Sequence, residues 1–155
     1  MMDYENIAIN PIKSGLVVDF KKLRDEIKRI GRIDFAFVAV PSQSLYGLPM
    51  ADMHNLGFDI IVCPKRKLDS QKLEDSVDMS IIRIGWTFLR YEEISDVVII
   101  SNDFHMIEIV REAEKQGKEV HLFGLDQISS ALKSILDPVK IHKVPLAPKT
   151  FLEGE

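Results

Sequence analysis

The chain has 155 residues, of which 46% are hydrophobic and 28% charged, and its formal net charge is −4 at pH 7; this composition is that of one ordinary globular domain. The negative charge argues against a protein that coats nucleic acid generally, because affinity for phosphate backbones normally comes from an excess of Lys and Arg. The single cysteine, Cys63, excludes an internal disulfide, and no Cys/His run in the sequence has the spacing of zinc ligands.

The first half of the chain alternates helical and strand patterns. Apolar residues recur with helical spacing over residues 16–30, and a glycine stops this stripe, so we expect a helix that ends near Ile30. Two short apolar runs, 33–40 and 59–63, are each ended by a proline. The first, rich in β-branched and aromatic residues, predicts a buried strand, and the second predicts the next strand. Between them, a loop with Gly and Pro leads into a short helix predicted at 50–56.

The second half begins with a charged connection at 65–75, which is typical of a solvent-exposed loop. The elements expected after it are a helix at 76–91, a strand at 96–100, a helix at 105–116 with a glycine C-terminal signal, a strand at 119–123 and a helix at 126–135. The tail from Pro138 contains two further prolines, and we expect it to run over the surface without regular structure.

Strands alternating with helices of this length predict an α/β fold. Such βαβ units have right-handed crossovers and a mostly parallel central sheet covered by helices on both faces, which makes a three-layer sandwich. No internal repeat or low-complexity segment is visible, so we expect one domain over residues 1–137 followed by a C-terminal tail, 138–155. In open parallel sheets the ligand lies beyond the carboxyl ends of the strands.

The distribution of apolar residues predicts a cytoplasmic protein. No stretch approaches the roughly 20 consecutive apolar residues that span a bilayer. The N-terminal run Met1-Met2-Asp3-Tyr4-Glu5 has neither the basic region nor the apolar core of a signal peptide. We therefore expect neither export nor membrane insertion, and a reducing compartment suits the single thiol.

Three acidic clusters stand where the apolar pattern stops. Asp3 and Asn6 open the chain, Asp78 enters the helix predicted at 76–91, and Asp103 follows the strand predicted at 96–100. Folding can gather these residues on one edge of the sheet, and gathered carboxylates are typical ligands of divalent cations. The sequence therefore suggests a metal site.

Two of these carboxylates also have a purely structural interpretation. Asp103 precedes a predicted helix, where an Asp that accepts backbone N–H groups as an N-cap stabilises the helix by about 1 kcal/mol. Asp78 follows Asp75 by three residues, which is compatible with simple capping. On helical spacing, however, Asp78 shares a stripe with Ile82 and Gly85, so it points inward, and an inward carboxylate is costly unless it is paired or bound to metal.

The other polar candidates leave similar alternatives open. Asn6 orients a carboxylate or a phosphate, or is a turn residue. His105 is a surface or capping histidine, or else a metal ligand or a phosphate contact. The basic run that includes Lys65 and Arg66, together with Lys72, is a solvated loop or a phosphate contact.

The order and spacing of these motifs resemble the NYN domain, a family of PIN-like, metal-dependent ribonucleases that includes the bacterial LabA-like group. The resemblance covers residues 3 to about 124. It rests on Asp-x-x-Asn at Asp3, on an Asp entering the third long helix, on a strand that ends in Ser101-x-Asp103, and on Gly117-Lys118 before the next strand. It implies a PIN-like, Rossmannoid version of the α/β sandwich.

The resemblance also implies a function, the hydrolysis of RNA phosphodiester bonds by an endoribonuclease that uses Mg²⁺ or Mn²⁺. Asp3, Asp78 and Asp103 would be the catalytic residues and metal ligands, with His105 as a further ligand. The cation would activate a water molecule and neutralise charge on the scissile phosphate.

Further residues would contact the RNA in this interpretation. Asn6 and Ser101 would fix the ligands and the substrate, while Lys65, Arg66 and Lys72 would guide the strand. Single-stranded RNA is the expected partner, because a shallow site needs an exposed backbone. A homodimer is expected by analogy with the family.

The sequence departs from the family pattern at three places. His105 stands where the family's Ser-Gly-Asp-x-Asp-Phe motif has a second acidic residue, and imidazole binds Mn²⁺ but suits Mg²⁺ poorly. Asp75 stands where the family often has Lys. Only Met1 and Met2 precede Asp3, so the first strand is either a stub over residues 3–9 or begins upstream.

These departures keep two alternatives open. One is a catalytically degenerate NYN fold that acts as an RNA-binding or regulatory module. The other is a small phosphate-handling protein, such as a phosphatase or nucleotide binder, although the sequence has no glycine-rich phosphate loop.

Overall fold

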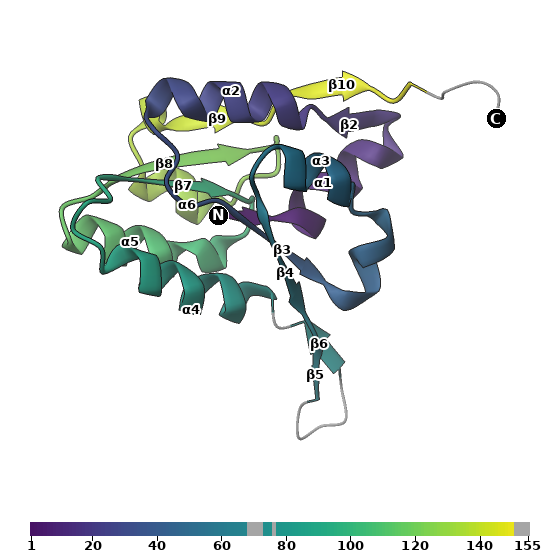
Figure 1. Ribbon diagram of the computed structural model, residues 1–155. Coiled ribbons are helices and arrows are strands. Elements are labelled where there is room, and N and C mark those ends of the chain that lie inside the picture. Colours follow the sequence, from purple (N-terminus) through teal and green to yellow (C-terminus); the bar gives the residue numbers. More distant parts are fainter. Residues whose placement is uncertain (68–72, 76, 151–155) are drawn as a thin grey trace.

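The computed structural model describes residues 1–67, 73–75 and 77–150, which form a three-layer α/β sandwich (Figure 1). The middle layer is a six-stranded sheet in which every pairing is parallel. In spatial order its strands are β4 (Asp59–Cys63), β3 (Phe37–Pro41), β1 (Met2–Asp3), β7 (Asp96–Ile100), β8 (Glu119–Gly124) and β9 (Ile141–Lys143). The predicted fold class is confirmed.

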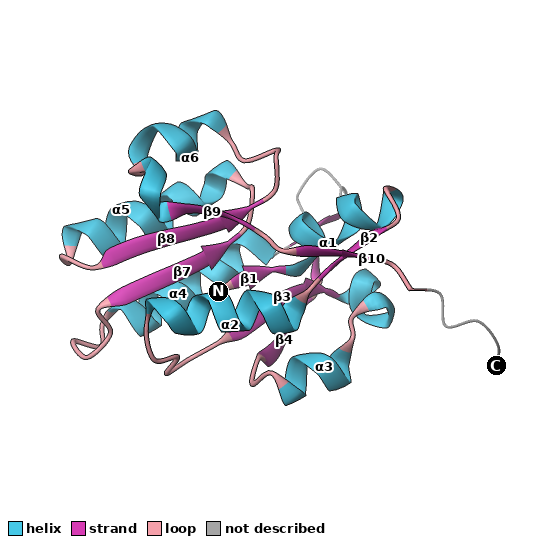
Figure 2. Ribbon diagram, turned by 90° about the horizontal axis from the view of Figure 1, so that it is seen from above, coloured by secondary structure: helices cyan, strands magenta, loops and turns pink. Residues whose placement is uncertain are grey.

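Helices cover both faces of this sheet, and each face has its own hydrophobic core (Figures 1 and 2). The helices of one face are α1 (Tyr4–Lys13), α2 (Phe20–Ile30) and α3 (Met50–Asn55). Those of the other face are α4 (Val77–Leu89), α5 (Ile107–Lys115) and α6 (Ser130–Ile135). Within the described residues, no helix has the length and apolar character needed to cross a bilayer.

Short elements complete the fold. They are three 3₁₀ helices, η1 (Ser42–Gly47), η2 (Phe104–Met106) and η3 (Pro138–Lys140), and two antiparallel pairs, β2 (Leu16–Val18) with β10 (Leu146–Pro148) and β5 (Lys65–Lys67) with β6 (Leu73–Asp75). The strands predicted at 59–63 and 96–100 have their predicted bounds, because a short apolar run ended by a turn signal is local information.

The helix expected over residues 16–30 begins only at Phe20, so that prediction is wrong for its first turn. Asp19 caps the helix by accepting the backbone N–H of Lys22 at 3.0 Å. The residues before it, Leu16–Val18, form β2 against β10. Three consecutive apolar residues are compatible with the spacing of a helix and with that of a strand. The partner that makes them a strand, β10, lies near the other end of the chain.

The tail and the charged connection are also more regular than expected. Ile141–Lys143 extends the sheet parallel to β8, and Leu146–Pro148 covers β2. Residues 65–67 and 73–75 pair as two antiparallel strands in place of an irregular surface loop. Such short strands carry little pattern of their own and are specified by their partners.

β1 is the shortest strand of the sheet although it lies at its centre. It pairs with Val38 and Ala39 of β3 on one side and with Ile100 of β7 on the other. Asp3 then caps α1, which begins at Tyr4, so the expected stub over residues 3–9 has only its first residue in the strand. This early turn places Asp3 at the carboxyl edge of the sheet.

Candidate metal centre

The carboxyl ends of the parallel strands position the candidate site. β1 ends at Asp3, and β7 is followed at once by Ser101 and, after one residue, by Asp103. Because neighbouring parallel strands end at the same edge, these residues belong to one region of the surface. The first turn of α4 brings Asp78 to the same region.

Asp78, Asp103 and His105 form a compact group of metal-ligand type. One ligand atom from each lies within 4.8 Å of the others. His105 Nδ1 lies 2.8 Å from Asp103 Oδ1 and 3.2 Å from Asp78 Oδ2. The side chains of the three residues are partly exposed, so an ion from solvent can reach them.

Two local hydrogen bonds hold Asp103 in this group. Its backbone N–H donates to Ser101 Oγ at 3.1 Å, and its own Oδ1 accepts the backbone N–H of His105 at 2.9 Å. The N-cap interpretation of Asp103 is therefore correct, with η2 as the capped helix. Asp103 can cap η2 and still belong to the group, because the capped turn also directs the imidazole of His105 towards the Asp103 carboxylate.

Asp78 reaches the group because α4 packs closely on α5. A Cβ atom at Gly85 would lie 2.7 Å from Cδ1 of Ile109 and 3.0 Å from Sδ of Met1. Because residue 85 has no side chain, α4 can lie close to α5 and to η2, the turn before α5. Gly85 and Asp78 share the helical stripe predicted from the sequence, and the Asp78 carboxylate faces His105.

Asp3 lies beside this group and outside the 4.8 Å set found among the described residues. It is 5% exposed, and its Oδ1 accepts the backbone N–H of Asn6 at 3.5 Å. Burial raises the pKa of Asp3 to about 7, and the negative charges of Asp78 and Asp103 add to this while the Asn6 N–H opposes it. Asp3 is therefore close enough to Asp78 and Asp103 for their charges to disfavour its ionised form.

Asn6 and Asn102 form a second layer behind the group. Asn6 Oδ1 accepts the backbone N–H of Asn102 at 2.7 Å, and Asn102 Oδ1 accepts the backbone N–H of Leu125 at 2.7 Å. The carbonyl of Asn102 accepts the N–H of Ser129. These bonds tie the turn after β7 to α1 and to the loop after β8, which fixes the position of the next residue, Asp103.

Asn102 was not among the residues singled out from the sequence. A polar residue after a buried strand carries no sign of its long-range partner, and the only local signal is its place inside the Ser-x-Asp motif. The structure assigns Asn6 to this network, where its side chain orients backbone, rather than to a contact with a carboxylate.

The structure describes only the backbone of two of the three basic residues that were predicted to contact RNA. Lys65 and Arg66 lie on β5, opposite Asp75 and Glu74 of β6. Their side chains, and Lys72 as a whole, lie outside what the structure describes.

The family model described as the NYN domain matches residues 1–141 of the chain. The chain belongs to the NYN domain family. The match confirms the resemblance inferred from Asp3, Asp78 and the Ser101-x-Asp103 motif. NYN domains have a PIN-like fold of nuclease type, divalent metals are the usual cofactors of such nucleases, and the family implies RNA as substrate.

One solved structure is similar to this NYN domain, whereas no curated protein matches it. A search of curated proteins finds no match. Among solved structures, a protein of unknown function from Vibrio parahaemolyticus is similar, with a TM-score of 0.76 and 13% sequence identity over 93% of this chain and 90% of that one. At this identity the likeness shows a shared fold.

Proposed function

We propose that this NYN domain is a metal-dependent endoribonuclease that hydrolyses RNA phosphodiester bonds at the Asp78, Asp103 and His105 group. The observation that carries the proposal is the convergence of two carboxylates and one imidazole within 4.8 Å, at the carboxyl edge of the sheet in a fold of nuclease type. Ligands in open parallel sheets bind at this edge.

The donor set suits a divalent cation. Asp78 and Asp103 supply carboxylate oxygens and His105 supplies Nδ1, a combination that favours Mn²⁺ over Mg²⁺ because Mg²⁺ prefers oxygen ligands. Such an ion, when bound, would lower the pKa of a water molecule and neutralise charge on the scissile phosphate.

Asp3 has a different role in this proposal from the direct ligand predicted from the sequence. Its carboxyl lies beside the group, and its pKa is raised to about 7. A carboxylate placed beside the ion is suited to accept a proton from the attacking water. Asn6 and Ser101 hold the turn that carries Asp103, so we propose them as positioning residues.

Phe104 offers a contact for a base of single-stranded RNA. Its ring is exposed and packs on the imidazole of His105 with 4.0 Å between the ring centroids. A base stacked on an exposed aromatic ring gains about 1 to 3 kcal/mol with little sequence preference. Lys65, Arg66 and Lys72 remain proposed guides for the strand, and the homodimer and the cytoplasmic location stay predictions.

The proposal is tested by incubating the purified protein with a labelled single-stranded RNA in EDTA, in Mg²⁺ and in Mn²⁺. Cleavage is expected with Mn²⁺, more slowly with Mg²⁺, and not in EDTA. Asp103→Asn should lower the rate at least hundredfold, while Asp52→Asn on the exposed side of α3 should leave it unchanged. Equal cleavage by Asp103→Asn and wild type would show a contaminating nuclease or a different site.

A degenerate RNA-binding or regulatory module is the second candidate, and one observation favours it. His105 Nδ1 lies between two carboxylates, where an imidazolium would supply the positive charge that a metal ion otherwise supplies. Such a protein would bind RNA but not cleave it, and Mn²⁺ would not raise its melting temperature. Loss of a Mn²⁺-induced shift in Asp103→Asn would argue against this candidate.

A further inference from the structure

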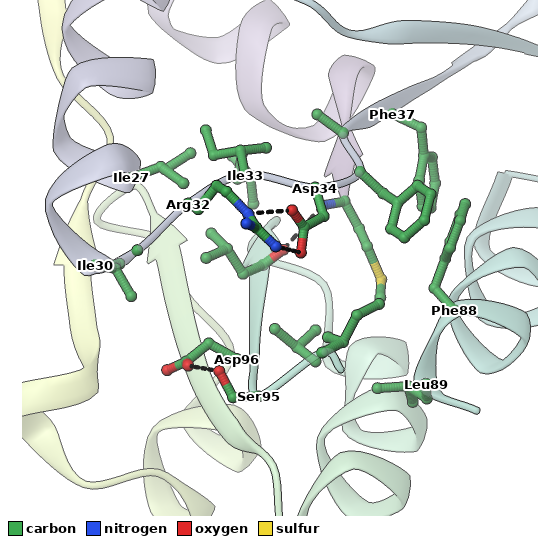
Figure 3. A pocket seen from close by; sticks show the side chains of 18 of the residues that line it. Ile27, Ile30, Arg32, Ile33, Asp34, Phe37, Phe88, Leu89, Ser95 and Asp96 are labelled. Carbon is green, nitrogen blue, oxygen red and sulfur yellow. Dashed lines mark hydrogen bonds and ion pairs between the residues drawn. The ribbon is translucent and has the colours of Figure 1, made fainter. Parts of the chain in front are cut away.

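The side of α4 that faces away from the sheet carries two apolar and two basic residues. The buried residues of this helix recur every four positions, at Val77, Ile81, Gly85 and Leu89. At the end of the helix, Phe88 and Leu89 line a cavity together with Phe37 of β3 (Figure 3). Side chains of a helix turn by about 100° per residue, so a second set of residues lies opposite the buried stripe. These residues are Met79, Arg83, Trp86 and, directly after the helix, Arg90.

All four of these residues, which we call the α4 face, are exposed. The exposed fraction is 57% for Met79 and 43% for Trp86, which is the single tryptophan of the chain. The helix belongs to the outer layer of the sandwich, so this face looks into solvent (Figure 1). An exposed indole next to guanidinium groups is a combination that binds the bases and phosphates of single-stranded nucleic acids.

The charge of the α4 face is entirely positive, although the formal net charge of the protein is −4. After Asp78, Arg83 is the only charged residue in α4, and Arg90 follows the helix. The ion pairs found among the described residues include neither of these arginines. Both guanidinium groups can therefore pair with an anionic ligand. Glu92 and Glu93 lie directly beyond Arg90, and the basic stretch ends there.

The α4 face begins at the candidate metal centre. Asp78, in the first turn of α4, has its Oδ2 3.2 Å from His105 Nδ1, and Met79 is the next residue. Trp86 lies eight residues beyond Asp78, which is about 12 Å along the helix axis. Arg90 lies about 18 Å beyond Asp78, a length that about five stacked nucleotides cover at about 3.4 Å each. A strand held at the metal group can therefore continue along this face.

We propose that the α4 face binds single-stranded RNA on one side of the scissile phosphate, with a base stacked on Trp86 and phosphates paired with Arg83 and Arg90. This inference rests on the proposed function, because it takes the Asp78, Asp103 and His105 group as the cleavage site. An indole offers a stacking surface to every base, and a guanidinium pairs with a phosphate through two parallel hydrogen bonds. The face therefore selects for single strands without selecting a base sequence.

A protein partner fits the α4 face less well. The spacing of positions 79, 83, 86 and 90 is also that of a coiled-coil seam, but such a seam is apolar, whereas arginines occupy every second position here. A second copy of this chain that used the same face would bring two positively charged surfaces together, which disfavours association. The phosphates of RNA carry the charge that complements this face.

The test measures RNA binding in EDTA, which prevents metal-dependent cleavage. The protein is titrated with an unlabelled twelve-nucleotide oligouridylate while the fluorescence of Trp86 is recorded, and a base stacked on the indole should quench it. Affinities of the variants come from the anisotropy of the same RNA carrying a fluorescein label. Trp86→Leu keeps apolar bulk but loses the aromatic ring, so it should weaken binding about fivefold or more. Trp86→Phe should retain most of the affinity.

The two arginines are tested through the salt dependence of binding. Arg83→Ala and Arg90→Ala should each weaken binding and reduce the slope of log K against the logarithm of salt concentration by about 0.7, the value for one phosphate contact with a single strand. Arg29→Ala is the matched control, because it removes an exposed arginine from α2, on the opposite face of the sheet, and it should leave the slope unchanged. Thermal unfolding of each variant verifies that the fold is intact.

Four outcomes would overturn the proposal. They are no RNA binding by the folded protein, binding that changes neither Trp86 fluorescence nor the affinity of Trp86→Leu, equal losses in Arg29→Ala and Arg83→Ala, and a dimer that forms through Trp86 without RNA. The nuclease proposal is judged separately. Cleavage in Mn²⁺ that all α4-face variants retain, with unchanged affinity, would refute only this inference. RNA that quenches Trp86 but is not cut with either ion would refute only the proposed cleavage.

Discussion

His105 Nδ1 lies 3.2 Å from Oδ2 of Asp78, and this contact joins the 3₁₀ turn after β7 to the first turn of α4. The two residues are far apart in the chain and come from different elements of one face of the sandwich. Their contact turns a pair of acidic motifs into a group with one nitrogen and two oxygen donors.

His105→Asp should shift the metal preference of RNA cleavage from Mn²⁺ towards Mg²⁺. The change replaces the nitrogen donor by an oxygen donor, which Mg²⁺ accepts more readily. We expect the ratio of the rate in Mg²⁺ to the rate in Mn²⁺ to rise at least tenfold, measured on one RNA under single-turnover conditions. His54→Asp, on the exposed side of α3, is the matched control, and an unchanged ratio in His105→Asp would mean that the imidazole is not a ligand.

Asp3→Asn should stabilise the metal-free protein, and more at pH 8 than at pH 5. Burial, with the charge of Asp78, raises the pKa of Asp3 from 3.8 to about 7. Between these values the native state holds a proton that the unfolded chain has lost, so the stability of the wild type falls as the pH rises through this window. From pH 5 to pH 7 the wild type should lose about 2 to 3 kcal/mol of stability relative to Asp3→Asn. Urea titrations of both proteins in EDTA measure this difference in the free energy of unfolding.

The control for this prediction is Asp126→Asn, since the side chain of Asp126 is 86% exposed. Its effect on the free energy of unfolding should be small at both pH values. If Asp3→Asn changed stability equally at pH 5 and pH 8, the carboxyl of Asp3 would not titrate in that range.

Asn102→Ala should lower both stability and catalysis. The change removes the acceptor of the Leu125 N–H, and an unpaired buried donor costs about 1 to 3 kcal/mol. It also frees the turn that carries Asp103, so kcat should fall more than KM changes. Denaturant unfolding and RNA cleavage measure the two effects; Asn55→Ala, at an exposed position, should change neither. A loss of stability with full kcat would show that Asn102 does not position Asp103.

Gly124→Ala should destabilise the protein by about 1 to 3 kcal/mol through overpacking. A Cβ atom at this position would overlap Cγ1 of Ile128 and lie 2.9 Å from Oδ1 of Asn102. The expected loss comes from steric overlap and not from backbone strain, since Gly124 is not among the glycines with positive φ. Gly47→Ala, where a Cβ would meet nothing within 4 Å, is the matched control for thermal unfolding.

A second substitution tests the mechanism of this effect. Ile128→Ala removes the side chain that a Cβ at residue 124 would overlap. Combined with Gly124→Ala it should therefore restore part of the loss, which appears as a favourable coupling in the double-mutant cycle. If the effects of the two substitutions on stability were strictly additive, the overlap with Ile128 would not be the cause of the loss.

The sequence by itself determined the alternation of strands and helices, and with it the fold class. Strands at 59–63 and 96–100 were predictable to the residue because each is a short apolar run that ends at a turn signal, which is local information. Asp78 and Asp103 were predictable as neighbours in the folded chain because parallel strands and the helices between them meet at the carboxyl edge of the sheet.

Only the tertiary structure decided which groups meet and which short segments become strands. Leu16–Val18 forms a strand because Leu146–Pro148 lies beside it, and Asn102 becomes a structural residue because Leu125 presents an N–H to it. Asp3 lies beside the Asp78, Asp103 and His105 group because β1 ends after two residues. The physical reason is common to all three: periodicity and capping depend on neighbours along the chain, whereas strand pairing, buried hydrogen bonds and electrostatic coupling depend on residues that only the folded chain brings together.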